Sequence, residues 1–189
     1  KHNNPCGAAL ADSLTNAFKK ALKCDSTSAF GGIVAFNKTV DSETAKDLSN
    51  IFLECIVAPS YSQEALNILS NKKNLRLLEL NKKMIKTNYK GSCKSIMGGL
   101  LVQDFDNKII NTSEWITVTK EKPSDSQLKD LKFSWQICKH VKSNAIVIVK
   151  DQMTIGIGAG QMNRVGAAKI AFKSANGGCK EAVLASDGF

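Results

Sequence analysis

Apolar side chains recur every three or four residues in several stretches of the chain, and that spacing predicts helices with one buried face. The clearest stretch is residues 8–22. Further helices are expected at residues 41–52, 62–70, 128–138 and 163–174. Asp41 is expected to cap the second helix, and Ser124 or Asp125 the fourth, because their side chains accept hydrogen bonds from free backbone N–H groups.

Short runs rich in Val, Ile and Phe, bounded by Gly, Asn or Pro, predict buried strands between these helices. The runs are residues 29–36, 54–58, 75–80, 95–103, 115–119, 145–150, 153–157 and 182–185. Asp151 and Gln152 separate two of them, which is the spacing of a two-residue β-hairpin. Alternating strands and helices predict an α/β layered fold with largely parallel pairing.

The charge balance narrows the choice of partners. Lys and Arg number 26 against 17 Asp and Glu, a formal net charge of +9, so the expected ligands are anions: nucleic acid, anionic lipid or a phosphorylated metabolite. Most of the excess lies in residues 71–94, where Tyr89 is the only aromatic residue. A solvated face explains this segment better than a stacking surface for single-stranded nucleic acid, and a basic nucleic-acid-binding module is the alternative.

The composition limits the classes of protein to which the chain can belong. Of the 189 residues, 43% are hydrophobic and 23% charged, which is ordinary for a globular domain. No apolar run approaches the roughly 20 residues that span a bilayer, and no signal peptide is visible, so a soluble, cytoplasmic protein is expected. The six cysteines show no two-residue spacing and are expected to be reduced thiols.

Two segments carry candidate chemistry. Lys1 and His2 begin a polar loop, KHNNPCG, just before a predicted helix. They place a cation and a base near a helix N-terminus, where the amide dipoles favour anions. The alternative interpretation is that these residues are a frayed chain terminus. His140 is expected in the core or at a helix end. The glycines of residues 156–160 resemble a phosphate loop, with turn geometry as the alternative, and Arg164 after them suits a carboxylate or phosphate.

Five segments, taken in order, resemble one family. They read KHNNPCGA at 1–8, STSAFGGIVAFN at 26–37, IVAPSYSQEALNILSNKKNLRLL at 56–78, VKSNAIVIVKD at 141–151 and GIGAGQMNRV at 156–165. They are similar to the transformylase region of the bifunctional purine-biosynthesis enzymes, which join 5-aminoimidazole-4-carboxamide ribonucleotide (AICAR) formyltransferase to inosine monophosphate (IMP) cyclohydrolase. The resemblance covers the whole chain, with divergence mainly at 79–95 and 108–126.

The resemblance implies a cytidine deaminase-like α/β fold, with a complete first lobe at 1–122 and a partial second lobe at 123–189. It also implies a homodimer with each active site at the subunit interface. The HxE zinc motif of deaminases is missing and Cys6 has no partner two residues on, so no metal is expected. Family segments that lie upstream and downstream of the match are missing, so the chain is expected to be a fragment without the cyclohydrolase domain.

The reaction that the resemblance implies moves a formyl group from 10-formyltetrahydrofolate to the 5-amino group of AICAR. His2 is then the expected base, and Lys1 stabilises the oxyanion or delivers a proton to the departing folate nitrogen. Asn144 is expected to hold the formyl group. Residues expected to bind substrate or folate are Phe30, Gly31, Glu54, Arg164 and Phe189. The expected partners are these small molecules, not nucleic acid or a membrane.

Overall fold

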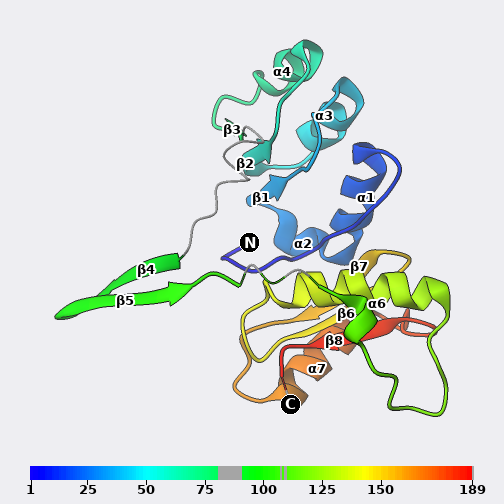
Figure 1. The fold of residues 1–189 in the computed structure, drawn as a ribbon. Helices are drawn as coiled ribbons and strands as arrows, with labels where there is room; N and C mark the ends of the chain where they lie inside the picture. Colours follow the sequence, from blue (N-terminus) through cyan, green and yellow to red (C-terminus); the bar gives the residue numbers. More distant parts are fainter. Residues whose placement is uncertain (81–90, 107, 109, 189) are drawn as a thin grey trace.

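The computed structural model describes residues 1–80, 91–106, 108 and 110–188 (Figure 1). Its elements form two α/β units, one before residue 81 and one from residue 125 onward, with a two-stranded hairpin between them along the chain. Among the described residues, one sheet is parallel and two are antiparallel, so the fold is mixed α/β. No helix in these ranges is long and apolar enough to cross a membrane.

The first unit is built on a parallel sheet with the strand order β1-β2-β3. Its elements are α1 (Leu14–Cys24), α2 (Ser26–Ala29), β1 (Gly32–Ala35), α3 (Ser42–Ser49), β2 (Leu53–Ala58), α4 (Gln63–Leu69) and β3 (Arg76–Glu79). Helices α3 and α4 supply the crossovers that parallel neighbours require. The buried side chains at the centre of the unit include Phe18, Val40, Leu48, Ile56 and Leu69.

The first helix is shorter than predicted, because the residues before it pair with the second unit. Ser13 caps α1 by accepting a hydrogen bond from the Asn16 amide (3.2 Å). Upstream of the cap, the chain is extended along β7: the Leu10 amide donates to the Gln152 carbonyl, and the Thr154 amide donates to the Ala8 carbonyl (both 2.9 Å). This pairing joins the two units, and α2 is a short helix that the pattern did not predict.

The second unit is a three-stranded sheet with a helix on each face. Its elements are α6 (Asp125–Cys138), β6 (Ile146–Lys150), β7 (Met153–Gly158), α7 (Arg164–Ser174) and β8 (Val183–Ser186). Val147 and Val149 pack with the core side chains of α6, whereas Ile146 and Ile148 pack with those of α7. Strand β6 is therefore buried on both sides, which explains its unbroken apolar run.

The prediction of largely parallel pairing is wrong for this unit, whose strand order β7-β6-β8 is antiparallel throughout. The predicted hairpin turn accounts for the antiparallel pair β6–β7, and in it Asp151 and Gln152 have φ angles of 52° and 54°. A two-residue turn can join only antiparallel strands. The buried Asp130 carboxylate of α6 accepts hydrogen bonds from both turn amides, at 2.9 and 2.7 Å.

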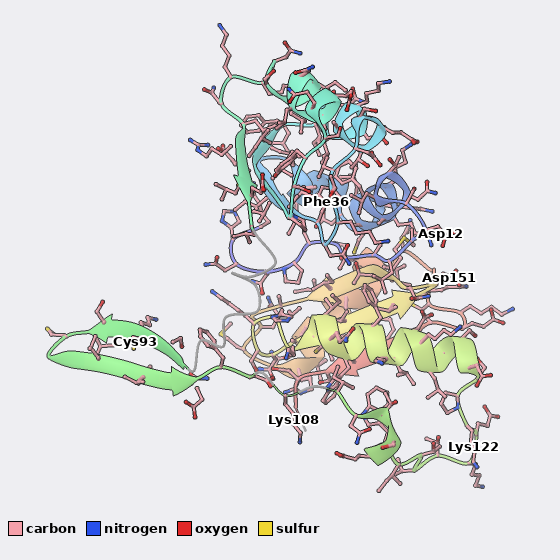
Figure 2. All side chains as sticks on the ribbon, turned by 45° about the horizontal axis from the view of Figure 1, so that its top comes forward. Asp12, Phe36, Cys93, Lys108, Lys122 and Asp151 are labelled. Carbon is pink, nitrogen blue, oxygen red and sulfur yellow. The ribbon has the colours of Figure 1, made fainter. Side chains whose placement is uncertain are left out.

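Two strand predictions between the units are also wrong. Residues 95–103 are not one strand but parts of a hairpin, β4 (Gly91–Ile96) and β5 (Gly99–Asp104), which turns at Gly98 with φ 82°. The hairpin extends away from both units, and Figure 2 shows Cys93 on it far from either core. Residues 115–119 form no strand; the short helix η1 (Thr112–Glu114) ends at Trp115, whose ring lies edge-on to Trp135 with centroids 6.4 Å apart.

Candidate functional site

The loop at residues 1–7 forms one wall of a cavity of about 500 Å³ on the first unit. The cavity is lined by Lys1, His2, Asn3, Asn4, Gly31, Gly32, Ile33 and Glu54. Four residues predicted from the sequence thus come together from three segments: the loop, the start of β1 and β2. The grouping depends on the parallel sheet, because β1 and β2 are neighbours in it.

Lys1 is held by the backbone just before β1. Its ammonium Nζ donates to the Phe30 carbonyl at 2.6 Å. The next residue, Gly31, has φ +65°, and a Cβ there would lie 3.1 Å from Lys1 Nζ. Glycine at position 31 therefore serves two needs, a left-handed backbone and room for the ammonium.

An apolar surface lies beside the Lys1 ammonium. The Phe30 side chain is 62% exposed and packs on Phe52, with ring centroids 5.2 Å apart. Ile33, on the cavity wall, is 65% exposed. These side chains provide a partly open wall against which a planar ring could pack.

His2 is presented by an unusual backbone. His2 and Asn3 have φ angles of 49° and 61°, and both are exposed. Left-handed backbone at a non-glycine residue costs about 1 kcal/mol or more, and such costs are typical of functional sites. Within the described ranges the His2 imidazole has no hydrogen-bond partner, so both ring nitrogens are available to a ligand.

Glu54 forms an ion pair that leaves its carboxylate accessible. Its Oε2 lies 2.8 Å from Arg76 Nη1; the Glu54 side chain is 47% exposed and the Arg76 side chain 66%. Exposed pairs contribute little to stability, typically under about 1 kcal/mol. The carboxylate can therefore exchange this partner for the donors of a ligand.

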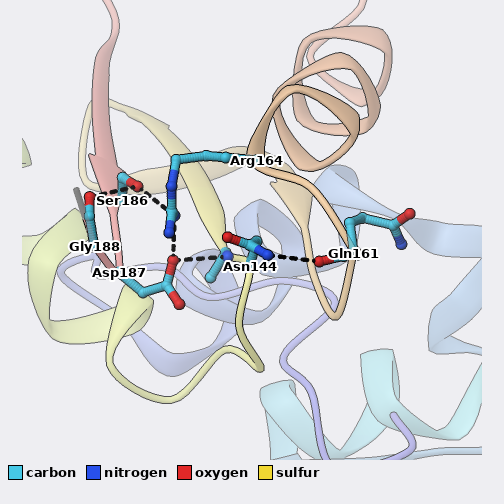
Figure 3. Close-up of polar contacts among 7 residues, drawn as sticks. Asn144, Gln161, Arg164, Ser186, Asp187 and Gly188 are labelled. Carbon is cyan, nitrogen blue, oxygen red and sulfur yellow. Dashed lines mark hydrogen bonds and ion pairs between the residues drawn. The ribbon is translucent and has the colours of Figure 1, made fainter.

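Asn144 and Arg164 do not line this cavity and lie instead in a polar group of the second unit (Figure 3). Asn144 Nδ2 donates to the Gln161 carbonyl at 2.8 Å. Arg164 Nη1 donates to Ser186 Oγ at 2.8 Å and forms an ion pair with the Asp187 carboxylate. The sequence predicted both residues, but neither lines the cavity that contains Lys1 and His2.

Sequence reasoning missed two members of this group, Ser186 and Asp187. Asp187 Oδ1 accepts from the Ala145 amide at 2.9 Å. Burial alone would raise the pKa of this carboxyl, but hydrogen bonds from Ser143, Ala145 and Arg164, with the Arg164 charge, hold the pKa well below its usual range. The only available signal was an aspartate just after a predicted strand. We call Asn144, Arg164, Ser186 and Asp187 the Arg164–Asp187 group.

Two other predictions have structural outcomes, and one falls on a residue that is not described. A Cβ at Gly156 or Gly158 would overlap the carbonyl oxygens of Ala171 or Ala167, so these two glycines serve the packing of β7 on α7. His140 follows the end of α6 and is exposed, so the helix-end interpretation is confirmed and the core interpretation is wrong. Phe189 lies outside the described residues.

Comparisons with known proteins agree on one family. The family described as AICARFT/IMPCHase bienzyme matches residues 1–174. The bifunctional purine biosynthesis protein PurH of Prochlorococcus marinus strain AS9601 is 65% identical over 189 residues, which are 100% of this chain and 37% of that protein. PurH of Nostoc punctiforme is 53% identical over 189 residues, 36% of its length. The chain thus spans little more than a third of the length of these relatives.

Proposed function

This chain belongs to the AICARFT/IMPCHase bienzyme family, and on that premise we propose that it forms part of a site for folate-dependent formyl transfer. The donor is 10-formyltetrahydrofolate and the acceptor is the 5-amino group of AICAR, in the synthesis of IMP. The observation that carries the proposal is the cavity shared by Lys1, His2, Gly31 and Glu54. It combines a base, a cation and a carboxylate beside an apolar wall.

His2 is the general base of the proposed reaction. The acceptor amine is a weak nucleophile, because its lone pair is delocalised into the imidazole ring. As the amine nitrogen forms a bond to the formyl carbon, its proton passes to the imidazole of His2. The bond from the formyl carbon to the folate nitrogen then breaks, and that nitrogen leaves with a proton.

Lys1 carries the charge that complements the intermediate. Its ammonium either stabilises the oxyanion of the tetrahedral adduct or supplies the proton to the departing folate nitrogen. The hydrogen bond from Nζ to the Phe30 carbonyl uses one of three donors, and within the described part of the chain the other two have no partner, so they can bind a ligand. Both roles need the ammonium at the cavity wall.

The remaining residues bind the substrates. Phe30 and Gly31 border them, and Glu54 accepts hydrogen bonds from the pterin ring. Asn144 holds the formyl group through its amide oxygen, since Nδ2 already donates to Gln161. Arg164 lies near the folate, with Phe189, and contributes through guanidinium N–H groups other than those that contact Ser186 and Asp187.

The complete site requires more than one copy of this chain, as proposed here. Asn144 and Arg164 do not line the cavity that contains Lys1 and His2. We therefore place the working site at the interface of a homodimer, where one copy supplies the loop and the other supplies Asn144 and Arg164. No metal takes part in this proposal.

The proposal extends to fold and location. Each three-stranded sheet with its helices corresponds to one lobe of a cytidine deaminase-like fold, the first lobe over 1–122 and the second beginning at 123. A soluble metabolic role with small-molecule substrates places the protein in the cytoplasm. The basic segment 71–94 is a solvated face in this account. Four of its lysines, at positions 82, 83, 86 and 90, lie in the range 81–90, outside the described residues.

The test is an assay of the intact protein that carries this chain. With AICAR and 10-formyltetrahydrofolate, we expect formation of formyl-AICAR and tetrahydrofolate in equal amounts. Absence of transfer would contradict the proposal. In the same preparation, oligonucleotide binding that falls steeply with salt, and that weakens in Lys72→Ala and Lys73→Ala, would favour the nucleic-acid alternative.

A further inference from the structure

We infer that Asn4 is a positioning residue, which fixes the Lys1–His2 loop against the turn that carries Asn144. The inference rests on the proposed function, because it assigns Asn4 a part in formyl transfer. Asn4 contacts no reacting group in this account. It acts by fixing the orientation of the loop residues on one side of its hydrogen bond and of the turn residues on the other.

The contact is a hydrogen bond between segments far apart in the sequence. Asn4 Oδ1 accepts from the Lys142 backbone amide at 2.9 Å. Because a peptide N–H can only donate, the amide oxygen of Asn4 must be the atom in contact. Among the described residues, this is the only hydrogen bond between loop 1–7 and turn 141–144.

The turn on the far side of this bond is itself firmly held. The Lys142 carbonyl accepts from the Gly160 amide at 2.7 Å. Two residues later, the backbone amide and Nδ2 of Asn144 both donate to the Gln161 carbonyl, at 3.2 and 2.8 Å. Asn4 therefore attaches the loop to a part of the second unit that is already fixed.

The near side of the loop is attached to the first unit. Lys1 Nζ donates to the Phe30 carbonyl, so among the described residues the loop has one side-chain hydrogen bond to each unit. His2 and Asn3 lie between these two contacts, in left-handed backbone. Pro5 further restricts the backbone of Asn4, because a residue before proline avoids the α region.

These contacts predict what the loss of Asn4 would do. Without the bond to Lys142, the left-handed pair keeps the backbone hydrogen bond from the Asn4 amide to the Lys1 carbonyl but loses its side-chain hydrogen bond to turn 141–144, so the imidazole is held less firmly toward the formyl group. A displacement of about 1 Å at a reacting group can cost about 100-fold in rate. Asn4 also lines the cavity, but Asn4→Ala leaves its charged side chains and apolar wall in place, so ground-state binding should change little.

The experiment compares Asn4→Ala and Asn4→Asp with the parent, in the intact protein. Asn4→Ala should lower kcat by about 10- to 100-fold with KM within about threefold. Asn4→Asp should recover most of kcat, since a carboxylate oxygen accepts from the same N–H. Asn16→Ala, on the exposed side of α1, is the matched amide-to-alanine control and should leave kcat unchanged.

Hydrogen exchange gives a readout independent of activity. The Lys142 amide should exchange about tenfold faster in Asn4→Ala and at nearly the parent rate in Asn4→Asp. The inference is wrong if Asn4→Ala keeps kcat within twofold, if Asn4→Asp is no better than Asn4→Ala, or if Lys142 exchange does not change. A parent protein that transfers no formyl group would overturn the proposed function, and this inference with it.

Discussion

The two polar groups of the molecule differ in how much of their bonding capacity is already used. In the loop cavity, the described structure gives the His2 imidazole no partner, and Glu54 has an exposed ion pair with Arg76. In the Arg164–Asp187 group, the carboxylate bonds to a backbone amide and to the Arg164 guanidinium (Figure 3). One group has capacity for a ligand, whereas the other mainly joins parts of its own unit.

The backbone supports the same distinction. Three residues at the loop cavity have left-handed backbone: His2, Asn3 and Gly31. This backbone holds the His2 and Asn3 side chains and the Lys1 ammonium at an open wall of the cavity. In the Arg164–Asp187 group, ordinary secondary structure does the positioning: Arg164 begins α7 and Asp187 follows β8. Substitutions in the first group should therefore change catalysis more than stability, whereas loss of the Asp187 carboxylate in the second should change stability first.

The largest expected effect is at His2. His2→Ala in the intact protein should lower kcat by about 10³-fold or more, with a modest change in KM and Tm, because an exposed general base is lost. His2→Asn is a second variant, since asparagine tolerates the left-handed backbone. The control is His140→Ala, at the other, exposed histidine. A rise in KM alone would make His2 a binding residue.

Asp187 should show the opposite behaviour. Its pKa is held well below the usual range in the folded state, so its stabilisation is complete above the unfolded pKa of about 4 and is lost as the pH falls toward the folded pKa. Asp187→Asn should lower the free energy of unfolding by about 2 kcal/mol at pH 7, and by less at pH 3.

Thermal unfolding of Asp187→Asn and the parent at both pH values checks this prediction. Asp12→Asn, at an exposed aspartate with no ion pair among the described residues, is the control and should leave Tm nearly unchanged. If Asp187→Asn were equally destabilising at pH 7 and pH 3, the carboxylate charge would not be the stabilising feature. If it abolished formyl transfer without changing Tm, the distinction between the two groups would be wrong.

Local patterns predicted the elements whose signals lie within a few residues. Asp41 and Ser124 cap their helices as expected, Ser124 rather than Asp125 being the cap, and Asp151 and Gln152 form the predicted turn. Each signal is a short-range hydrogen bond or turn preference. The apolar periods predicted that these helices exist for the same reason, because a period can be recognised within a few residues.

The failures have a different origin. Residues 8–10 belong to a helical period, but they pair along β7, some 140 residues away, and nothing local reports that partner. The contacts of Asn4 and Asp187 likewise join a side chain to a distant backbone amide. For the site, the family resemblance identified Lys1, His2 and Glu54, while the absence of Asn144 from the lining of their cavity became visible only in three dimensions.

The smallest expected effect is at Gly31, where strain and contact can be separated. Gly31→Ala places a Cβ at φ +65°, which costs about 1 kcal/mol. The same Cβ would lie 3.1 Å from Lys1 Nζ, so the ammonium, which donates to the Phe30 carbonyl, must shift by a few tenths of an ångström. We expect a stability loss of about 1 kcal/mol and a fall in kcat of about tenfold. Gly177→Ala is the matched control, because Gly177 has φ +80° but no atom within 4 Å of its Cβ position. The control should lose similar stability by thermal unfolding and keep its kcat; if both variants lost activity equally, backbone strain rather than the displaced ammonium would explain the effect at Gly31.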